Sequence, residues 1–198
     1  AVYFPGMIVT VTIPPGPPVM ALDAHLDTHL DLVRVLVQDP GLGNPGPKDV
    51  HGVGVLARVL RTLALPDGGL RALIEVVDRV TVRDFAEHAT FGAACTPLRA
   101  VTQPGDLRKV QALAQRAREL APQALPGNPQ DRPPELDRAL TFPEAPDRLC
   151  DHIAGQLGLP APEGQEILGE LHLDARLERL VWFMERAREY STLSQRIA

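Results

Sequence analysis

The segment VGVLARVLRTLALPDGGLRALIEVVDRVTV (53–82) decides the fold. Two apolar runs rich in β-branched residues flank the tetrapeptide PDGG (66–69). Asp and Gly tolerate the positive φ that hairpin turns require, so the segment predicts one long β-hairpin.

More strands are predicted on the N-terminal side of this hairpin. The run VYFPGMIVTVTI (2–13) alternates in the way typical of a strand, and LVRVLVQ (32–38) has the few polar interruptions of a central strand. Between them, PPGPP (14–18) excludes both a helix and a sheet ladder. A short helix is predicted at about 18–29.

The period of the sequence changes to helical after QPGD (103–106). Asp106 is predicted to cap a helix, and Asp174 to cap a long last helix. The fold class is therefore α+β, with a β-rich domain at 1–100 and an all-helical bundle at 104–198. The helices before the last one are expected at about 106–121, 134–140, 146–157 and 162–170.

The last predicted helix has an apolar seam and a charged surface. Its Arg and Glu residues between 176 and 189 predict pairs at i, i+3 and i, i+4 on an exposed face. Trp182 and Phe183 point about 100° apart, so one is expected in the core and the other at a contact with a neighbouring subunit or the bundle. No Gly or Pro ends the helix before Ala198, which predicts that the polypeptide continues. The seam repeats at 3–4–3 spacing through Leu177, Leu180, Met184 and Ala187.

The stretch HLDTHLD (25–31) contains His and Asp, which are among the commonest ligands of zinc and other divalent ions. On a helix, His25 and His29 fall on one flank and the aspartates fall on the other. The two histidines alone share a face, and a metal-dependent enzyme would need a third ligand such as His51. The favoured interpretation is a solvated helix that runs into a strand, and the metal enzyme is kept as the alternative from a different class.

Other catalytic and binding motifs are missing from the sequence. GLGNPG (41–46) is followed by proline and a strand, so no helix can hold a pyrophosphate there. Ser191 and Ser194, the only serines, lie on the last helix without a nearby lysine. The net charge of −5 argues against a nucleic-acid partner. No apolar run approaches the ~18–20 residues of a membrane helix, so a cytoplasmic protein is expected.

Several motifs occur in an order that resembles the N-terminal domain of Lon-type ATP-dependent proteases. They begin with YFPGM (3–7) and the hairpin, and continue through APDRLCDHIAGQLGLP (145–160) and EGQEILGELHLDARLERLVWFMERAREY (163–190). PPGPP (14–18) replaces the usual G-R-x-x-S of the family, and Asp78-Arg79 stands where the family has Glu-Gly. These departures indicate a divergent member.

The resemblance implies a PUA-like β pseudo-barrel followed by a helical bundle. It implies a bacterial chain that is not itself an enzyme and holds no cofactor. ATP, Mg²⁺ and a serine–lysine proteolytic dyad would belong to other modules of a longer, homo-oligomeric protease. Its partners would be unfolded or damaged proteins, with no nucleic acid and no membrane. A stand-alone adaptor or small-ligand binder of the same fold is the alternative.

A receptor for unfolded proteins needs exposed apolar side chains with weak sequence demands. Turns hold such side chains best, which points to the residues near the start of the chain and at the hairpin tip. The alternative is that Phe4, Met7 and Leu65 belong to the core. No catalytic residue and no metal ligand is assigned. The predicted client contacts are Phe4, Pro5, Met7, Leu65 and Pro66, and the predicted partner or oligomer surface is Trp182, Phe183 and Arg186.

Overall fold

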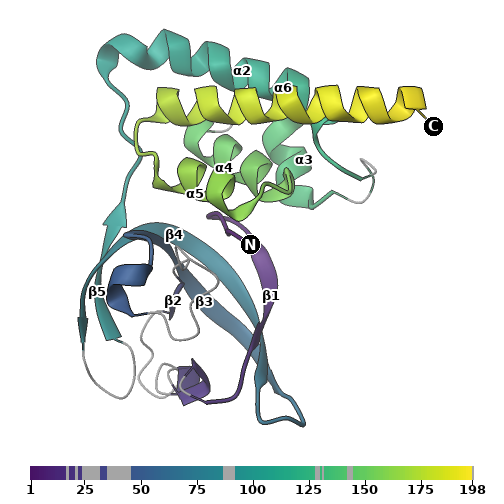
Figure 1. Ribbon diagram of the computed structural model, residues 1–198. Helices are drawn as coiled ribbons and strands as arrows, with labels where there is room; N and C mark the ends of the chain where they lie inside the picture. Colours follow the sequence, from purple (N-terminus) through teal and green to yellow (C-terminus); the bar gives the residue numbers. More distant parts are fainter. Residues whose placement is uncertain are drawn as a thin grey trace. The chain divides into compact units, whose positions relative to one another are not determined.

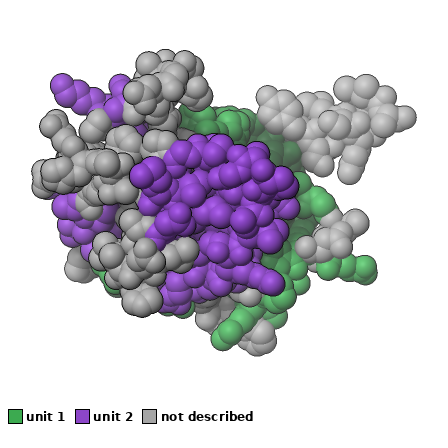
Figure 2. All heavy atoms as spheres, turned by 90° about the horizontal axis from the view of Figure 1, so that it is seen from below, with its two compact units in different colours: residues 1–4, 99–198 green, residues 5–98 purple. Residues whose placement is uncertain are grey.

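The computed structural model describes residues 1–16, 18–20, 22–23, 32–34, 46–86, 92–127, 130, 132–141 and 145–197 (Figure 1). The chain divides into two compact units, coloured separately in Figure 2. Residues 5–98 form what we call the sheet unit, and residues 1–4 with 99–198 form the helical unit. The first four residues therefore belong to the helical unit, although the sequence groups them with the strands that follow.

The sheet unit is built on an antiparallel sheet of five strands in the order β1-β4-β3-β2, with β5 also paired to β4. Strand β4 is 17 residues long, so the edge that faces away from β3 pairs first with β1 and then with β5. The sequence does not predict β5, because GAACTPL has a single β-branched residue. The strands are β1 (Ile8–Ile13), β2 (Leu32–Arg34), β3 (Val53–Ala64), β4 (Leu70–Ala86) and β5 (Gly92–Leu98).

The predicted hairpin is confirmed as β3 and β4. The carbonyl oxygen of Leu65 accepts a hydrogen bond from the Gly68 N–H at 3.1 Å, and the Leu65 N–H donates to the Gly69 carbonyl at 2.9 Å. Gly68 has a φ of +83°, which a residue with a side chain adopts only with strain. The Asp67 carboxylate accepts a further bond from the Gly69 N–H at 2.9 Å. The PDGG sequence thus supplies both the conformation and the hydrogen bonds of the turn.

Two β-bulges interrupt the β3–β4 pairing. Val59 and Arg61 face consecutive residues of β4, which leaves Leu60 between them without a cross-strand partner. In the same way, Leu56 and Ala57 face Asp78 and Val76, so that Val77 has no partner in β3. An extra residue of this kind bends the strand and changes the direction of its side chain. The two extra residues, Leu60 and Val77, are both apolar and both exposed.

The helical unit contains five α-helices among its described residues, and the predicted α+β class is confirmed. Each helix begins and ends within three residues of the bounds expected from the sequence, apart from the open end of the last one. Helix α6 lies alongside α2 (Figure 1). The helices are α2 (Leu107–Ala124), α3 (Pro134–Thr141), α4 (Pro146–Gln156), α5 (Ala161–Gly169) and α6 (Leu173–Ile197).

Packing between α2 and α6 joins small side chains to large ones. The buried positions of α2 include Ala114, Ala117 and Ala121, and small residues at a helix contact allow the two axes to approach closely. Helix α6 packs against α2, α4 and α5, and Leu177, Leu180 and Met184 of its predicted seam are completely buried. The apolar spacing of the sequence therefore identified the correct face of the last helix.

The two predicted helix caps differ in outcome, because Asp106 occupies the N-cap position of α2, as predicted, whereas the prediction for Asp174 is wrong. Asp106 lies in a 3-10 turn (Pro104–Asp106) directly before α2, and its side chain makes no capping hydrogen bond. Asp174 lies inside the first turn of α6, which begins one residue earlier. Its carboxylate instead accepts a hydrogen bond from Lys109 Nζ at 2.8 Å. The side chain of Asp174 thus joins α6 to α2.

The predicted ion pairs along α6 need correction, because three of its arginines, Arg176, Arg179 and Arg186, form ion pairs with other helices. Arg179 Nη1 lies 3.0 Å from Glu166 Oε2 of α5, and Arg176 is completely buried. Glu185 of α6 pairs with Arg116 of α2 at 2.9 Å. The neighbouring helices stand close enough to supply partners, so the charges of α6 join helices to one another.

Part of the N-terminal prediction lies outside the described residues. Residues 18–20 and 22–23 are helical, as expected for the start of the short helix, and Leu22 is buried. HLDTHLD (25–31), with His25 and His29, and the first five residues of GLGNPG (41–46) lie outside the described residues.

Candidate functional site

Phe4 was predicted to contact clients, and the structure corrects this interpretation. Its side chain is only 1% exposed, and it belongs to the helical unit. Val2 in the same segment packs against α5, where a Cβ added to Gly164 would stand 3.1 Å from Val2 Cβ. The first four residues therefore complete an apolar core, and Phe4 cannot reach a client unless this segment is displaced.

The other four predicted client contacts are exposed or partly exposed residues of the sheet unit. Pro5, Met7 and Leu65 are half-buried, and Pro66 is exposed. The hairpin tip lies against the PPGPP segment, because a Cβ added to Gly69 would stand 3.5 Å from Pro15 Cδ. Leu65 and Pro66 thus lie at one end of the hairpin, next to a second proline-rich turn. They could extend a larger apolar surface but do not form one.

A larger apolar surface lies on the outward side of β1, β4 and β3. Alternate side chains of a strand point to opposite faces, and the inward face here is buried at Ala57, Ala72, Ile74 and Val76. The register places the opposite set in three cross-strand rows. These rows are Ile8–Glu75–Arg58, Thr10–Leu73–Arg61 and Thr12–Arg71–Leu63.

The two bulges add apolar groups to the same side. Leu60 directly precedes Arg61, whose cross-strand partner is Leu73. Val77 lies two residues after Glu75 on β4. We call the three rows together with Leu60 and Val77 the outer sheet face. Of the five large apolar side chains that are exposed in the described part of the sheet unit, four lie on it. These four, Ile8, Leu60, Leu63 and Val77, are between 43% and 61% exposed.

Scattered single apolar residues are normal at a protein surface, but a continuous group of them marks an interaction site. The rows bring Leu73 and Leu63 within the ~5–8 Å that separates cross-strand and diagonal neighbours. The sequence did not identify this face, because its membership depends on the pairing register and on the bulges. The one available signal was the alternation of Ile8, Thr10 and Thr12 along β1.

The predicted partner surface forms a second cluster, on α6. Phe183 is 4% exposed and Trp182 is 56% exposed, so one ring is in the core and the other is at the surface, as expected. The assignment of Phe183 to the partner surface is therefore corrected, because its ring is buried. The rings stand edge to face, with centroids 5.0 Å apart. The guanidinium of Arg186 lies 4.9 Å from the Trp182 centroid and 5.2 Å from that of Phe183. A cation–π contact of this kind orients both side chains.

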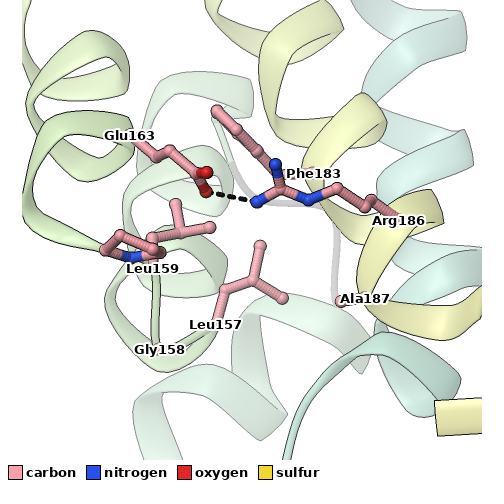
Figure 3. Close-up of a pocket in the computed structure, with 8 residues that line it drawn as sticks. Leu157, Gly158, Leu159, Glu163, Phe183, Arg186 and Ala187 are labelled. Carbon is pink, nitrogen blue, oxygen red and sulfur yellow. Dashed lines mark hydrogen bonds and ion pairs between the residues drawn. The ribbon is translucent and has the colours of Figure 1, made fainter. Parts of the chain in front are cut away.

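A cavity of about 380 Å³ adjoins this cluster (Figure 3). Leu157 and Leu159 from the α4–α5 connection line it, with Phe183 of α6 opposite. Glu163 of α5 and Arg186 of α6 point toward one another and form an ion pair (Figure 3). The volume matches one small ligand or one bulky side chain. The arrangement binds helices α5 and α6 together, and it leaves Trp182 as the exposed apolar group nearby.

The described residues offer little to catalysis. They contain no group of three or more His, Cys, Asp or Glu side chains that could hold a metal ion. Burial raises the pKa of the Cys95 thiol, which disfavours the reactive thiolate. Over the same part of the chain, no helix is both long and apolar enough to cross a membrane.

Comparison with known proteins decides the family. The family model described as the ATP-dependent protease La (LON) substrate-binding domain matches residues 1–186. The chain belongs to this family. The resemblance inferred from the sequence motifs is confirmed.

Relatives of the LON substrate-binding domain extend well beyond this chain. The Lon protease of Phenylobacterium zucineum is 32% identical over 198 residues, which cover 100% of this chain and 25% of that protein. The Lon protease of Escherichia coli K12 is 28% identical over 199 residues, again with 25% of that protein covered. The chain thus spans about a quarter of the curated relatives it matches.

Solved structures support the same fold. The N-terminal domain of the Mycobacterium avium complex Lon protease superposes with a TM-score of 0.69 at 18% identity, over 93% of each chain. The Lon N-terminal domain protein from Xanthomonas campestris gives a TM-score of 0.57 at 15% identity. At these identities the likeness concerns the fold alone.

Proposed function

We propose that this chain recognises unfolded or damaged proteins through the outer sheet face, for a longer ATP-dependent protease. The observation that carries the proposal is the clustering of Ile8, Leu60, Leu63 and Val77 on one side of β1, β4 and β3. An unfolded protein exposes apolar side chains that a native protein buries, so a surface with clustered apolar groups distinguishes the two states. The match to a substrate-binding domain supports the same role.

The shape of the face suits a receptor with weak sequence demands. A sheet surface presents side chains at regular intervals and has no deep pocket that would require one particular residue. The half-buried Leu73 of β4 lies between Thr10 of β1 and Arg61 of β3, so each of the three strands contributes at least one apolar side chain to the face, namely Ile8, Leu73 and Leu63. Affinity then comes from the total apolar area covered, at roughly 25 cal/mol per Å² less the cost of ordering the client.

The remaining parts of the proposal concern the longer protein. Relatives four times as long as this chain are Lon proteases, and we assign proteolysis, ATP and Mg²⁺ to regions outside the 198 residues. This chain would bind and present clients without cutting them. Trp182, with Arg186 beside it, would contact a partner subunit or a neighbouring module of a homo-oligomer, while the buried Phe183 supports the Trp182 ring from the core.

A binding titration tests the proposed function. The full chain is added to a fluorescently labelled protein that has been reduced and carboxymethylated, so that it stays unfolded, and anisotropy is followed. We expect saturable binding to this protein and none to the same protein in its native, disulfide-bonded form. Equal binding to both forms, or to neither, would contradict the proposal.

The intact mass of the native polypeptide separates the proposal from the stand-alone adaptor. A mass far above 21.5 kDa in the source cells supports a domain of a larger protease. A mass near that value would show that the chain acts without an attached protease.

A further inference from the structure

The outer sheet face has an excess of positively charged side chains. The three rows of this face contain three arginines and one carboxylate. They are Arg58, Arg61, Arg71 and Glu75. The chain as a whole has a net charge of −5. The apolar side chains thus lie in a locally basic surface on an acidic protein.

Two of these arginines are available to a ligand. Arg58 Nη1 lies 3.1 Å from Glu75 Oε2, so this cation is already paired. Arg61 and Arg71 are exposed, and neither forms an ion pair with any residue that the structure describes. Among the residues that the structure describes, Arg61 and Arg71 thus have no ion-pair partner, and the Glu75 carboxylate is already paired with Arg58. Asp78, which follows Val77, accepts a hydrogen bond from the Arg79 N–H.

The unpaired cations alternate with leucines. The register sets Arg61 of β3 opposite Leu73 of β4, and Arg71 of β4 opposite Leu63 of β3. Residues opposite one another across strands stand about 5 Å apart, and an extended chain advances about 3.3 Å per residue. Suppose that a client segment places an apolar side chain on Leu63 or Leu73. The client residues one to three positions along its chain then lie within reach of the guanidinium of Arg61 or Arg71.

We propose that the outer sheet face selects client segments in which apolar residues are flanked by acidic residues. This inference rests on the proposed function and specifies its substrate class. A client that covers the leucines also removes water from Arg61 and Arg71. A carboxylate compensates for that lost hydration with a charge-assisted hydrogen bond, a neutral side chain compensates in part, and a lysine adds repulsion. Guanidinium groups can bind a carboxylate with two parallel hydrogen bonds, which favours Asp and Glu.

Three synthetic peptides test this preference against the full chain. They share one apolar core sequence and differ only in flanks of Asp and Glu, of Gln, or of Lys. In fluorescence anisotropy at low salt we expect affinity to fall in that order, with the acidic peptide about 3- to 10-fold tighter than the Gln peptide. Salt screens exposed charges, so the difference should shrink at high ionic strength.

A matched pair of variants locates the effect. The double variant Arg61→Gln with Arg71→Gln should bind the acidic peptide no more tightly than the Gln peptide. Its affinity for the Gln peptide should equal that of the wild type. Arg108→Gln with Arg138→Gln removes the same charge from exposed positions of the helical unit and should preserve the advantage.

Equal binding of the three peptides would overturn the charge preference and leave the proposed function standing. The same would follow if both double variants lost the advantage alike, or if a poly-glutamate peptide bound as tightly as the acidic peptide. If none of the three peptides binds, the charge preference and the proposed function fail together.

Discussion

Arg176 of α6 and Asp151 of α4 form an ion pair inside the helical unit, with 3.7 Å between Nη1 and Oδ1. The arginine is completely buried and the aspartate is 4% exposed. Charges removed from water cost several kcal/mol each unless they are matched by a partner. This pair therefore fixes how α4 and α6 pack, and each member depends on the other.

Replacing Asp151 with asparagine should destabilise the protein strongly. The change leaves the Arg176 cation buried without its carboxylate, and removal of one partner of a buried pair costs about 3–5 kcal/mol. Urea unfolding followed by circular dichroism measures the free energy of unfolding. Asp147→Asn, on the same helix but partly exposed, is the control and should change it by less than about 0.5 kcal/mol. Equal effects of the two substitutions would show that the pair contributes nothing specific.

Gly69→Ala should destabilise the sheet unit at the hairpin tip. The new Cβ would stand 2.8 Å from the carbonyl oxygen of Ile13 and 3.1 Å from Asp67 Oδ1, and the first is backbone that cannot rotate away. We expect a loss of about 1–3 kcal/mol in the free energy of unfolding. Gly52→Ala has no atom within 4 Å of its new Cβ and serves as the control. An unchanged urea midpoint for Gly69→Ala would mean that the tip does not pack against the end of β1 in this way.

The two adjacent aromatic residues of α6 should respond differently to truncation. Phe183→Ala opens a cavity in the core and is expected to cost about 3–5 kcal/mol of stability. Trp182→Ala removes a largely exposed ring, so the cost should stay near 1 kcal/mol or below. Far-UV circular dichroism in urea compares them, since Trp182 is the only tryptophan. A larger loss for Trp182→Ala would reverse the assignment of core and surface.

Asp174 should make stability depend on pH in acid. The hydrogen bond from Lys109 holds the pKa of this carboxyl below its ordinary value of 3.8. At pH values between the folded and the unfolded pKa of Asp174, the unfolded chain binds more protons than the folded one. Stability therefore falls as the pH drops through the folded pKa. The wild type should exceed Asp174→Asn in stability by a constant amount above about pH 5, and the difference should disappear in stronger acid. A difference between wild type and Asp174→Asn that stays constant into strong acid would contradict this account.

Local signals in the sequence predicted most of the elements correctly. The hairpin followed from PDGG between two β-branched runs, and the helices from their apolar spacing and flanking prolines. Each of these depends on residues near one another in the chain. Strand β5 was missed because GAACTPL becomes a strand through its pairing with β4, which composition does not reveal.

The candidate site could not be read from the sequence for a related reason. Phe4 and Ile8 are both apolar and four residues apart, yet Phe4 is buried in the helical unit and Ile8 points to solvent. The positions of Leu60 and Val77 depend on bulges that arise only in the paired strands. Arg176 resembled an exposed helix residue until α4 was found to supply its buried partner.

The measurement that tests the central claim most directly compares two double variants for binding to the carboxymethylated, unfolded protein. Leu60→Ser with Leu63→Ser removes apolar groups from the outer sheet face. Met20→Ser with Leu107→Ser removes similarly exposed groups from elsewhere on the surface. We expect about tenfold weaker binding for the first variant, roughly 1.4 kcal/mol, and a change of less than about twofold for the second. Unaltered binding by the first variant, with both variants folded by circular dichroism, would contradict the assignment of the outer sheet face as the client-binding surface.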